Sequence, residues 1–562
     1  MTCRNCGREI IDGSVFCPHC GTTQAPAPES PVQGAAPPWE GPEGGGKKKK
    51  TGLLIGIGAA VVAVIALAAV FAGGLFASPK KQVEKAFVKS AAAYVQAGKK
   101  LDLPDMEQWR KDQKITQNMG LELESINSEL IGYDLSALSG LGVGMLTSYS
   151  GADRWASCEL RGWWGDDELL DLSVKADGGA LYFNSPQLTG DTHYGVNTET
   201  LGADLTAMTG DDSMEDLSFN FFDLVELALE KTDQEKLERD LKEANKVLWE
   251  QAQVKKTGAK TLSVNGTETK TAAYQVTISQ GALNQYVGSL KTALAALDYY
   301  GLYEEMFQSM GMPREAVQDF LDQLESADPY SELADGLRDI VDELGDVELE
   351  VCLSGGYVSA VEYEGELYRS DVSIDLYLGG GEEYVDDLSL TVEMDGGAIE
   401  VKSSGDHGLK SGVFTDETTV RVKDSGASLA RVTSDMTLDP SKKEDNLQWK
   451  LGVDSSGLSV CVLDMAGDVY WGRDQLTLNP VRISVRAMGA EVCTLSFSYH
   501  VENSAAAGTV ENPGIITQMS EDELQHVALD VQSRAEAWAS EMQEMMTSRL
   551  PSELLWALMF AL

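Results

Sequence analysis

The sequence predicts an N-terminal zinc ribbon, one transmembrane helix and a large α+β exterior domain with an extensive antiparallel, half-barrel-like sheet and packed helices. Three observations lead to this fold class. Four cysteines form two close pairs near the N-terminus. Residues 53–76 read LLIGIGAAVVAVIALAAVFAGGLF and contain no charged side chain. Short runs of alternating apolar and polar residues, separated by turn residues, fill 346–505, as expected for antiparallel strands.

The ribbon is predicted from Cys3, Cys6, Cys17 and Cys20, two Cys-x-x-Cys pairs that are each followed by a glycine. Two such turns direct four thiolates at one centre, and four sulfur ligands in a tetrahedron are typical of structural zinc. We therefore predict one structural Zn²⁺ in residues 1–23, with iron as the alternative metal. A unit this short buries too little apolar surface to fold unaided, so the metal would supply its folding free energy.

Residues 24–50 are predicted to be a disordered linker, because they are rich in Pro, Gly and Ala and lack apolar periodicity. The linker ends in the lysine cluster Lys47–Lys50. Lysines beside an apolar run favour the cytoplasmic side, and reduced thiolates persist best in the cytosol. Four further lysines between 80 and 89 weaken the charge asymmetry. We predict a cytoplasmic N-terminus.

Residues 53–76 are predicted to form the transmembrane helix. At about 1.5 Å per residue this run reaches about 36 Å, which exceeds a hydrocarbon layer of about 30 Å. It is also longer than the apolar core of a cleaved signal peptide. The expected location is the cell membrane, with a single pass and the C-terminal domain outside the cytoplasm.

The segment beyond the apolar run divides into three parts by pattern. Residues 79–345 mix helical and strand patterns, 346–505 predict an antiparallel sheet that is open or nearly closed, and 518–562 predict C-terminal helices. Helices are expected at Pro79 and over 233–256, 281–297, 313–324 and 332–344.

The last long helix is expected to begin at a capping box of Ser520 and Glu523. Its apolar seam predicts packing across the concave face of the sheet, with a coiled-coil dimer as the alternative. The chain ends in an apolar segment, 551–562, that is too short to span a bilayer. Whether this segment is a plug, part of the core or a membrane contact stays open.

The chain is strongly acidic, with 89 Asp and Glu against 44 Lys and Arg and a net charge of −45. Nearly all of the acidic residues lie beyond the apolar run. Such a charge repels nucleic acid and anionic lipid head groups, so no nucleic-acid partner is expected for the exterior domain. The acidic cluster of Glu382, Glu383, Asp386 and Asp387 lacks the calcium-loop pattern and is interpreted as solvated strand ends.

No pattern typical of a catalytic or cofactor-binding site is present. The sequence has no His pair in zinc-protease spacing, no Gly-x-Ser-x-Gly motif and no phosphate-binding glycine loop. We predict no catalytic residues and a non-enzymatic protein, and we place an exterior hydrolase third among the hypotheses. Four further cysteines are scattered through the large segment, and their pairing stays open: Cys158, Cys352, Cys461 and Cys493.

The first 77 residues resemble zinc-ribbon, single-pass membrane proteins of Gram-positive bacteria. The rest is loosely similar in architecture to the half-barrels of bacterial lipoprotein carriers, which hold acyl chains in a concave groove. The leading hypothesis is a non-enzymatic, membrane-anchored envelope protein with an acidic exterior interaction or sensing domain and a ribbon that docks a cytosolic partner. The alternative is an exterior half-barrel carrier that binds a lipid or other amphiphile.

Overall fold

A computed structural model describes residues 78–105, 108–109, 112–127, 134–231, 234–264, 266–295, 297–312, 314–326, 329–505, 508–552 and 554–555. The chain divides into two compact units, Met1–Ile55 and Gly56–Leu562. All described residues belong to the second unit. The predicted zinc ribbon, the linker and the segment 53–76 lie outside the described residues.

The predicted fold class needs one correction, which concerns the membrane-spanning helix. No helix in the part of the chain that the structure describes is both long and apolar enough to cross a membrane. The segment for which a spanning helix was predicted, 53–76, is outside that part. The architecture that the structure does show is a very large antiparallel sheet with packed helices, as the strand pattern indicated.

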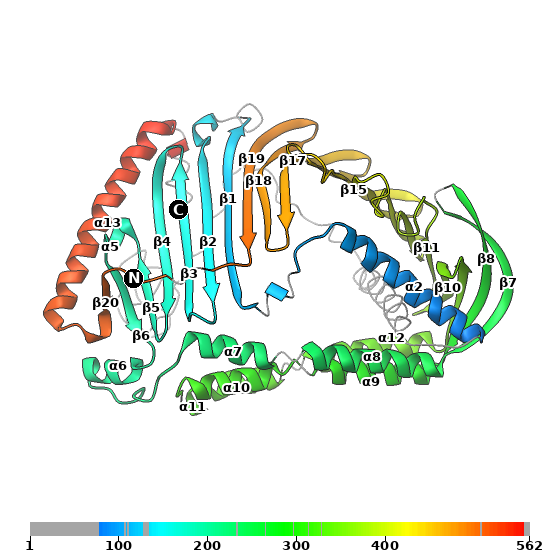
Figure 1. The fold of residues 1–562 in the computed structure, drawn as a ribbon, viewed down its shortest axis with the longest axis horizontal. Helices are drawn as coiled ribbons and strands as arrows, with labels where there is room; N and C mark the ends of the chain where they lie inside the picture. Colours follow the sequence, from blue (N-terminus) through cyan, green and yellow to red (C-terminus); the bar gives the residue numbers. More distant parts are fainter. Residues whose placement is uncertain are drawn as a thin grey trace, which may run out of the picture. The chain divides into compact units, whose positions relative to one another are not determined.

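Within the described residues, twenty strands form one open sheet (Figure 1). All neighbours are antiparallel except the parallel pair β6–β20. From edge to edge the order is β7 (Gln253–Val264), β8 (Thr267–Ile278), β9 (Val347–Ser354), β10 (Tyr357–Leu367), β11 (Ser370–Leu378), β12 (Asp387–Met394), β13 (Gly397–Ser404), β14 (Phe414–Asp424), β15 (Ala427–Leu438), β16 (Leu447–Ser455), β17 (Leu458–Gly472), β18 (Gln475–Ala487), β19 (Ala490–Glu502), β1 (Lys114–Ile126), β2 (Leu141–Ser150), β3 (Trp155–Trp164), β4 (Asp167–Asp177), β5 (Ala180–Asn184), β6 (His193–Asn197) and β20 (Pro513–Ile515).

Besides the short β6–β20 pair, one long pairing joins the early strands to the late ones. β1 lies beside β19, with Leu121 opposite Phe497 and Leu123 opposite Leu495. In strands β1–β6 and β7–β19, neighbours in the sheet are also successive strands in the sequence, and helices α9–α12 are inserted between β8 and β9. The β1–β19 pair therefore makes a single sheet from two segments that several helices separate in sequence.

The helices begin and end at recognisable signals. The helix predicted at Pro79 is confirmed as α2 (Pro79–Lys100), and Ser78 caps it by accepting a hydrogen bond from the Lys81 amide. The helix predicted over 233–256 is shorter, α8 (Gln234–Gln251), because residues from Gln253 onward pair with β8. The others are α5 (Pro186–Thr189), α6 (Leu201–Thr209), α7 (Phe221–Lys231), α9 (Gln280–Leu294), α10 (Tyr299–Ser309), α11 (Arg314–Ser326), α12 (Pro329–Leu344) and α13 (Glu521–Arg549).

The helix α13 begins at the predicted capping box. The Ser520 hydroxyl accepts from the Glu523 amide, while the Glu523 carboxylate accepts from the Ser520 amide. The helix packs against α5, and the Trp538 indole N–H donates to the Leu169 carbonyl at 2.7 Å. No residue of α13 is fully buried. The helix is thus held along one side by the β3–β5 region.

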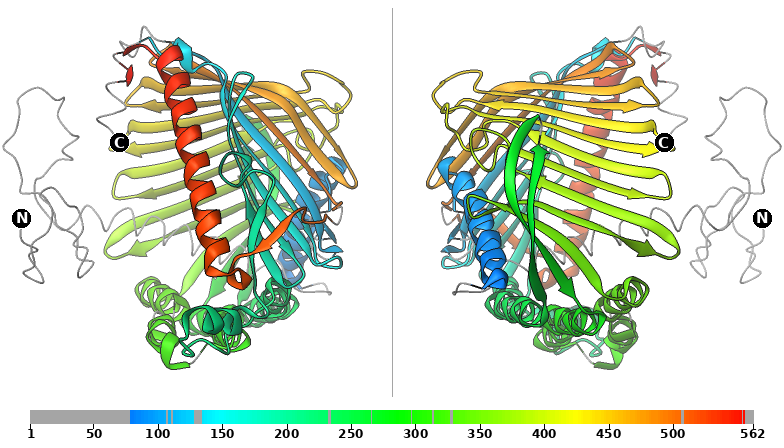
Figure 2. Two further views of the ribbon diagram at one scale, coloured as in Figure 1. Left: turned by 90° about the vertical axis from the view of Figure 1, so that its left-hand side faces the viewer. Right: turned by 90° about the vertical axis from the view of Figure 1, so that its right-hand side faces the viewer.

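The main hydrophobic core lies at one end of the sheet, on strands β8–β11. Helices α2, α8, α9 and α12 cover one face of these strands and contribute buried residues such as Phe87, Leu248, Val287 and Val341. The opposite face carries a small second cluster that includes Leu262 of β7 and the buried Cys352. Both faces of these strands are therefore covered. Figure 1 also shows α6, α7, α10 and α11 below strands β1–β6, and Figure 2 shows α13 running along one side of the sheet.

Replacing Leu248 by Ala should destabilise the fold. Leu248 is 1% exposed in the main core, and such truncations cost about 2–5 kcal/mol through lost burial and the remaining cavity. The matched control is Leu529→Ala on α13, where the side chain is 58% exposed and the expected change is within about 0.5 kcal/mol. Urea unfolding of both variants measures the difference, and equal midpoints would contradict this account of the core.

Candidate functional site: an apolar path across the sheet

The apolar face of the core continues far beyond the helices that cover it. Residues directly opposite each other on antiparallel strands share a face of the sheet. In the core, Val351, Val361 and Leu376 form one such row. The row then passes through Leu390, Val401, Val420, Val432 and Val453 on strands β12–β16. Apolar side chains therefore follow one face across these strands.

The same face stays apolar through β17–β19 and into the early strands. Alternate positions of a strand lie on the same face, so two cross-strand pairs that are two residues apart on a shared strand belong to the same face. The pairs that extend it are Leu451–Leu463, Leu463–Val485, Ile483–Leu495, Phe497–Leu121, Leu121–Val143, Met145–Leu160, Leu160–Leu172 and Val174–Phe183. We call the whole series from Val401 on β13 to Phe183 on β5 the apolar path.

Many side chains of the apolar path are open to solvent. Val143 is 55% exposed, Val174 50% and Leu160 44%. Leu121, Phe183, Val432 and Val453 are also exposed. Isolated exposed apolar residues need no explanation, but a contiguous series of this extent on a folded protein marks an interaction surface.

The opposite face of the same strands is polar. Lys450 and Arg486 flank Asp464 there at 3.9 and 3.4 Å. On β3, the ring of Trp163 lies over Gly142 and Gly144, and a Cβ atom on Gly142 would meet that ring at 2.2 Å. The Trp163 indole N–H donates to Glu122. The contrast between the faces identifies the apolar path as the unusual surface.

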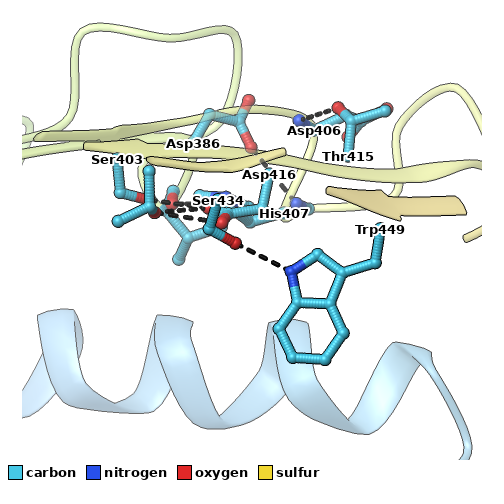
Figure 3. A network of polar contacts seen from close by, with 11 residues as sticks. Asp386, Ser403, Asp406, His407, Thr415, Asp416, Ser434 and Trp449 are labelled. Atoms are coloured by element: carbon cyan, nitrogen blue, oxygen red, sulfur yellow. Dashed lines mark hydrogen bonds and ion pairs between the residues drawn. The ribbon is translucent and has the colours of Figure 1, made fainter. Parts of the chain in front are cut away.

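A polar network lies on the same face as the apolar path, beside its β13–β16 section (Figure 3). His407 contacts the Val385 carbonyl through Nδ1 and Asp416 Oδ1 through Nε2, both at 2.8 Å. Asp416 also accepts hydrogen bonds from the hydroxyls of Ser403 and Thr418. Each partner of His407 is an acceptor, so both ring nitrogens must donate a hydrogen bond. Only the protonated form of the ring, the imidazolium, can do this.

The electrostatics of this pair agree with its geometry. The hydrogen bond to Asp416 raises the pKa of His407 above its ordinary value, against the opposing effect of burial. Burial alone would raise the pKa of Asp416, but hydrogen bonds from His407, Ser403 and Thr418 outweigh it and lower the pKa. His407 and Asp416 form an ion pair, and their remaining polar atoms bond to neighbouring groups of the protein. The network therefore ties the 405–413 loop to β14.

The interpretation of the acidic cluster as solvated strand ends is wrong for two of its members. Asp386 and Asp387 are 5% and 7% exposed. Asp386 accepts hydrogen bonds from the Glu383 and Gly408 amides, so its carboxylate holds two loops together. Among the described residues, no group of three or more His, Cys, Asp or Glu side chains is arranged to hold a metal ion.

The predicted zinc ligands, Cys3, Cys6, Cys17 and Cys20, lie outside the described residues. The four other cysteines are free thiols, which answers the open question of their pairing. Three of them share the face of the apolar path: Cys158 opposite Val174, Cys461 opposite Val453 and Cys493 opposite Val485. Cys352 is buried in the core, where burial raises its pKa.

The stability that the His407–Asp416 pair contributes should depend on pH. Because the folded pKa of His407 is raised, its contribution is fully present below the ordinary value of 6.5 and is lost as pH rises through the raised value. Replacing His407 by Gln should therefore lower the urea midpoint more at about pH 6 than at about pH 9. His526→Gln, on the exposed side of α13, is the control. An equal loss from His407→Gln at both pH values would contradict this assignment.

Comparison with known proteins gives a match only at the N-terminus. Residues 2–23 match the family model of the zinc-ribbon domain. No curated protein and no solved structure matches the chain. The family match indicates zinc binding within residues 2–23.

Proposed function

We propose that the protein is a non-enzymatic binding protein whose apolar path holds the hydrocarbon part of a lipid or similar amphiphile. The observation that carries this proposal is the exposed series of apolar side chains on one sheet face. Covering such a series with hydrocarbon is favourable by about 25 cal/mol for each Å² removed from water. This favours the carrier hypothesis over the interaction or sensing hypothesis that the sequence put first.

The surroundings of the apolar path suit hydrocarbon better than peptide. The interior strands have a neighbour on both sides, so their backbone groups are already paired and offer little to an added strand. The polar network beside the path is internally bonded. Buried polar side-chain atoms without a partner, within the described residues, belong to neither the apolar path nor the network. A polar ligand would therefore find few partners there.

The extent of the apolar path bears on the ligand. Adjacent strands lie about 4.8 Å apart, so the path from β13 to β5 covers about 50 Å. The hydrocarbon core of a bilayer is about 30 Å thick, so the chains of one leaflet reach about 15 Å. The path thus has room for several acyl chains in sequence or for one much longer chain. The net charge of −45 disfavours an anionic head group, so we propose neutral or zwitterionic ligands.

For the N-terminal part, we propose that Cys3, Cys6, Cys17 and Cys20 hold one structural zinc ion and that the folded ribbon docks a protein partner. Four thiolates complete a tetrahedral site and leave no open position for catalysis, which supports a structural role. The predicted placement of the ribbon in the cytoplasm and of the acidic part outside it remains a prediction.

A carboxylate placed on the apolar path should weaken ligand binding. Leu121→Asp and Val453→Asp each put a charge beside the bound hydrocarbon, and we expect about a tenfold loss of affinity, because a penalty of about 1.4 kcal/mol suffices for that factor. Fluorescence of 1-N-phenylnaphthylamine, titrated with the full chain, measures the affinity.

Matched controls add the same charge to the other face of the same strands. Asn118→Asp on β1 and Gln448→Asp on β16 change exposed residues on the polar face. They should leave dye binding unchanged. Equal losses for both members of each pair, or no loss in either, would contradict a ligand on the apolar path.

Zinc analysis tests the ribbon separately. The purified full chain should contain one zinc ion, and replacing Cys3 and Cys6 by Ser should remove it, because two ligands cannot retain structural zinc. Elemental analysis by mass spectrometry gives the metal content and identifies the metal. Iron in place of zinc, or zinc retained by the double variant, would contradict the assignment.

A further inference from the structure

One long edge of the sheet carries a row of exposed apolar hairpin turns. The turns β10–β11, β12–β13, β14–β15, β16–β17 and β18–β19 all lie at this edge, because consecutive hairpins in a meander turn at alternate edges. We call these five turns and their flanking residues the hairpin rim. Its exposed large apolar residues are Tyr368, Val422, Leu429, Leu458, Val460 and Met488.

The exposure at two tips is unusually high. Met488 is 89% exposed and Leu458 is 74% exposed. Packing within the described chain therefore does not explain why these residues are large and apolar. Each such side chain in water forgoes the stabilisation that its burial would supply.

The backbone at Met488 strengthens this argument. Met488 and Gly489 have φ values of 51° and 84°, so both central residues of the turn are left-handed. Asn, Asp and Gly favour such turns, because short polar side chains bond locally and glycine has no Cβ atom. Three other rim turns use Asp395, Ser425 and Ser456 before their glycines, and the β10–β11 turn has Tyr368 and Arg369 at these positions. Methionine gains nothing from this turn, so its presence at the tip points to an external contact.

The hairpin rim adjoins the apolar path. Leu458 pairs with Ser455 at the end of β16. Val453, two residues before Ser455 on the same strand, belongs to the apolar path. The β3–β4 turn lies at the same edge, since β2 starts there and pairs with the end of β3. Arg549 at the end of α13 donates to the Trp164 carbonyl beside that turn. One edge of the sheet thus combines apolar tips with access to the apolar path.

We propose that the hairpin rim inserts its apolar tips into the surface of a lipid bilayer and that lipid enters the apolar path there. The second part rests on the proposed function, whereas the first does not. Successive tips at this edge are two strands apart, about 10 Å, and so are separate protrusions. A bilayer accepts separate protrusions, whereas a protein interface needs a continuous, closely packed patch.

The charges near the tips favour a zwitterionic surface. Arg431 and Arg486 lie close to this edge, but so do Asp454 and Glu491, which are their direct partners across neighbouring strands. Charge is therefore balanced at these positions, whereas Glu366, Asp371, Glu393 and Asp395 flank the β10–β11 and β12–β13 turns, and the net charge of the chain is negative. A phosphatidylcholine surface fits this balance better than an anionic one.

The test is photo-crosslinking of the full chain to phosphatidylcholine vesicles whose acyl chains carry a diazirine. Mass spectrometry of the digested protein should find lipid adducts on peptides that contain Leu429, Leu458 and Met488. Peptides with Leu529 and Met208, which are exposed elsewhere, should lack them. Because adducts are located by residue, binding through other segments does not affect the result. Adducts only outside the hairpin rim would overturn the inference.

A pair of variants links the hairpin rim to lipid entry. The double variant Leu458→Ser and Met488→Ser should lower the number of vesicle-lipid adducts on the apolar path several-fold. The control double variant Leu529→Ser and Met208→Ser makes the same chemical change away from the rim and should leave that number unchanged. A free monoacylglycerol with a diazirine in its acyl chain, which is neutral, should label the path in both proteins. If it labels the path but vesicle lipid never labels the rim, the rim inference fails alone. If vesicle lipid labels the rim but the monoacylglycerol never labels the path, the proposed function fails instead.

Discussion

The pairing of β1 with β19 makes a single sheet out of two runs of strands that lie far apart in the sequence. It joins strands β1–β6 to strands β7–β19, and both meanders otherwise consist of neighbours in sequence. Leu121 opposite Phe497 and Leu123 opposite Leu495 make this junction apolar on one face. Without it, the apolar path would be divided into two shorter surfaces. The same long-range contact therefore completes the sheet and the proposed binding surface.

Most of the buried apolar residues of the main core lie at one end of the sheet. Strands β8–β11 are covered on both faces, by helices on one and by part of β7 on the other. Most positions on β13–β19 and β1–β4 are only half-buried. A sheet face that is apolar but uncovered gains little for folding, because its side chains stay in water. The β8–β11 end therefore supplies the main core, and the apolar face of the remaining strands keeps several exposed side chains.

The sequence patterns predicted much of this architecture. Alternation over 347–501 predicted the antiparallel strands, and three- and four-residue spacing predicted α9, α11 and α12. Strands β1 and β2 were not predicted, because glycines such as Gly142 and Gly144, which accommodate Trp163, interrupt the alternation. The apolar path was not predicted either. Alternation shows that each strand has an apolar face, but only the register shows that these faces align across strands.

Native mass spectrometry of the full chain after incubation with phosphatidylcholine, under gentle and then dissociating conditions, measures directly whether the protein holds lipid. The apolar path covers about 50 Å and one leaflet about 15 Å, so the account predicts complexes with more than one lipid that dissociate on activation. Their number should fall when Leu160→Asp and Val453→Asp divide the path. A protein that stays free of lipid would contradict the claim that this face binds hydrocarbon.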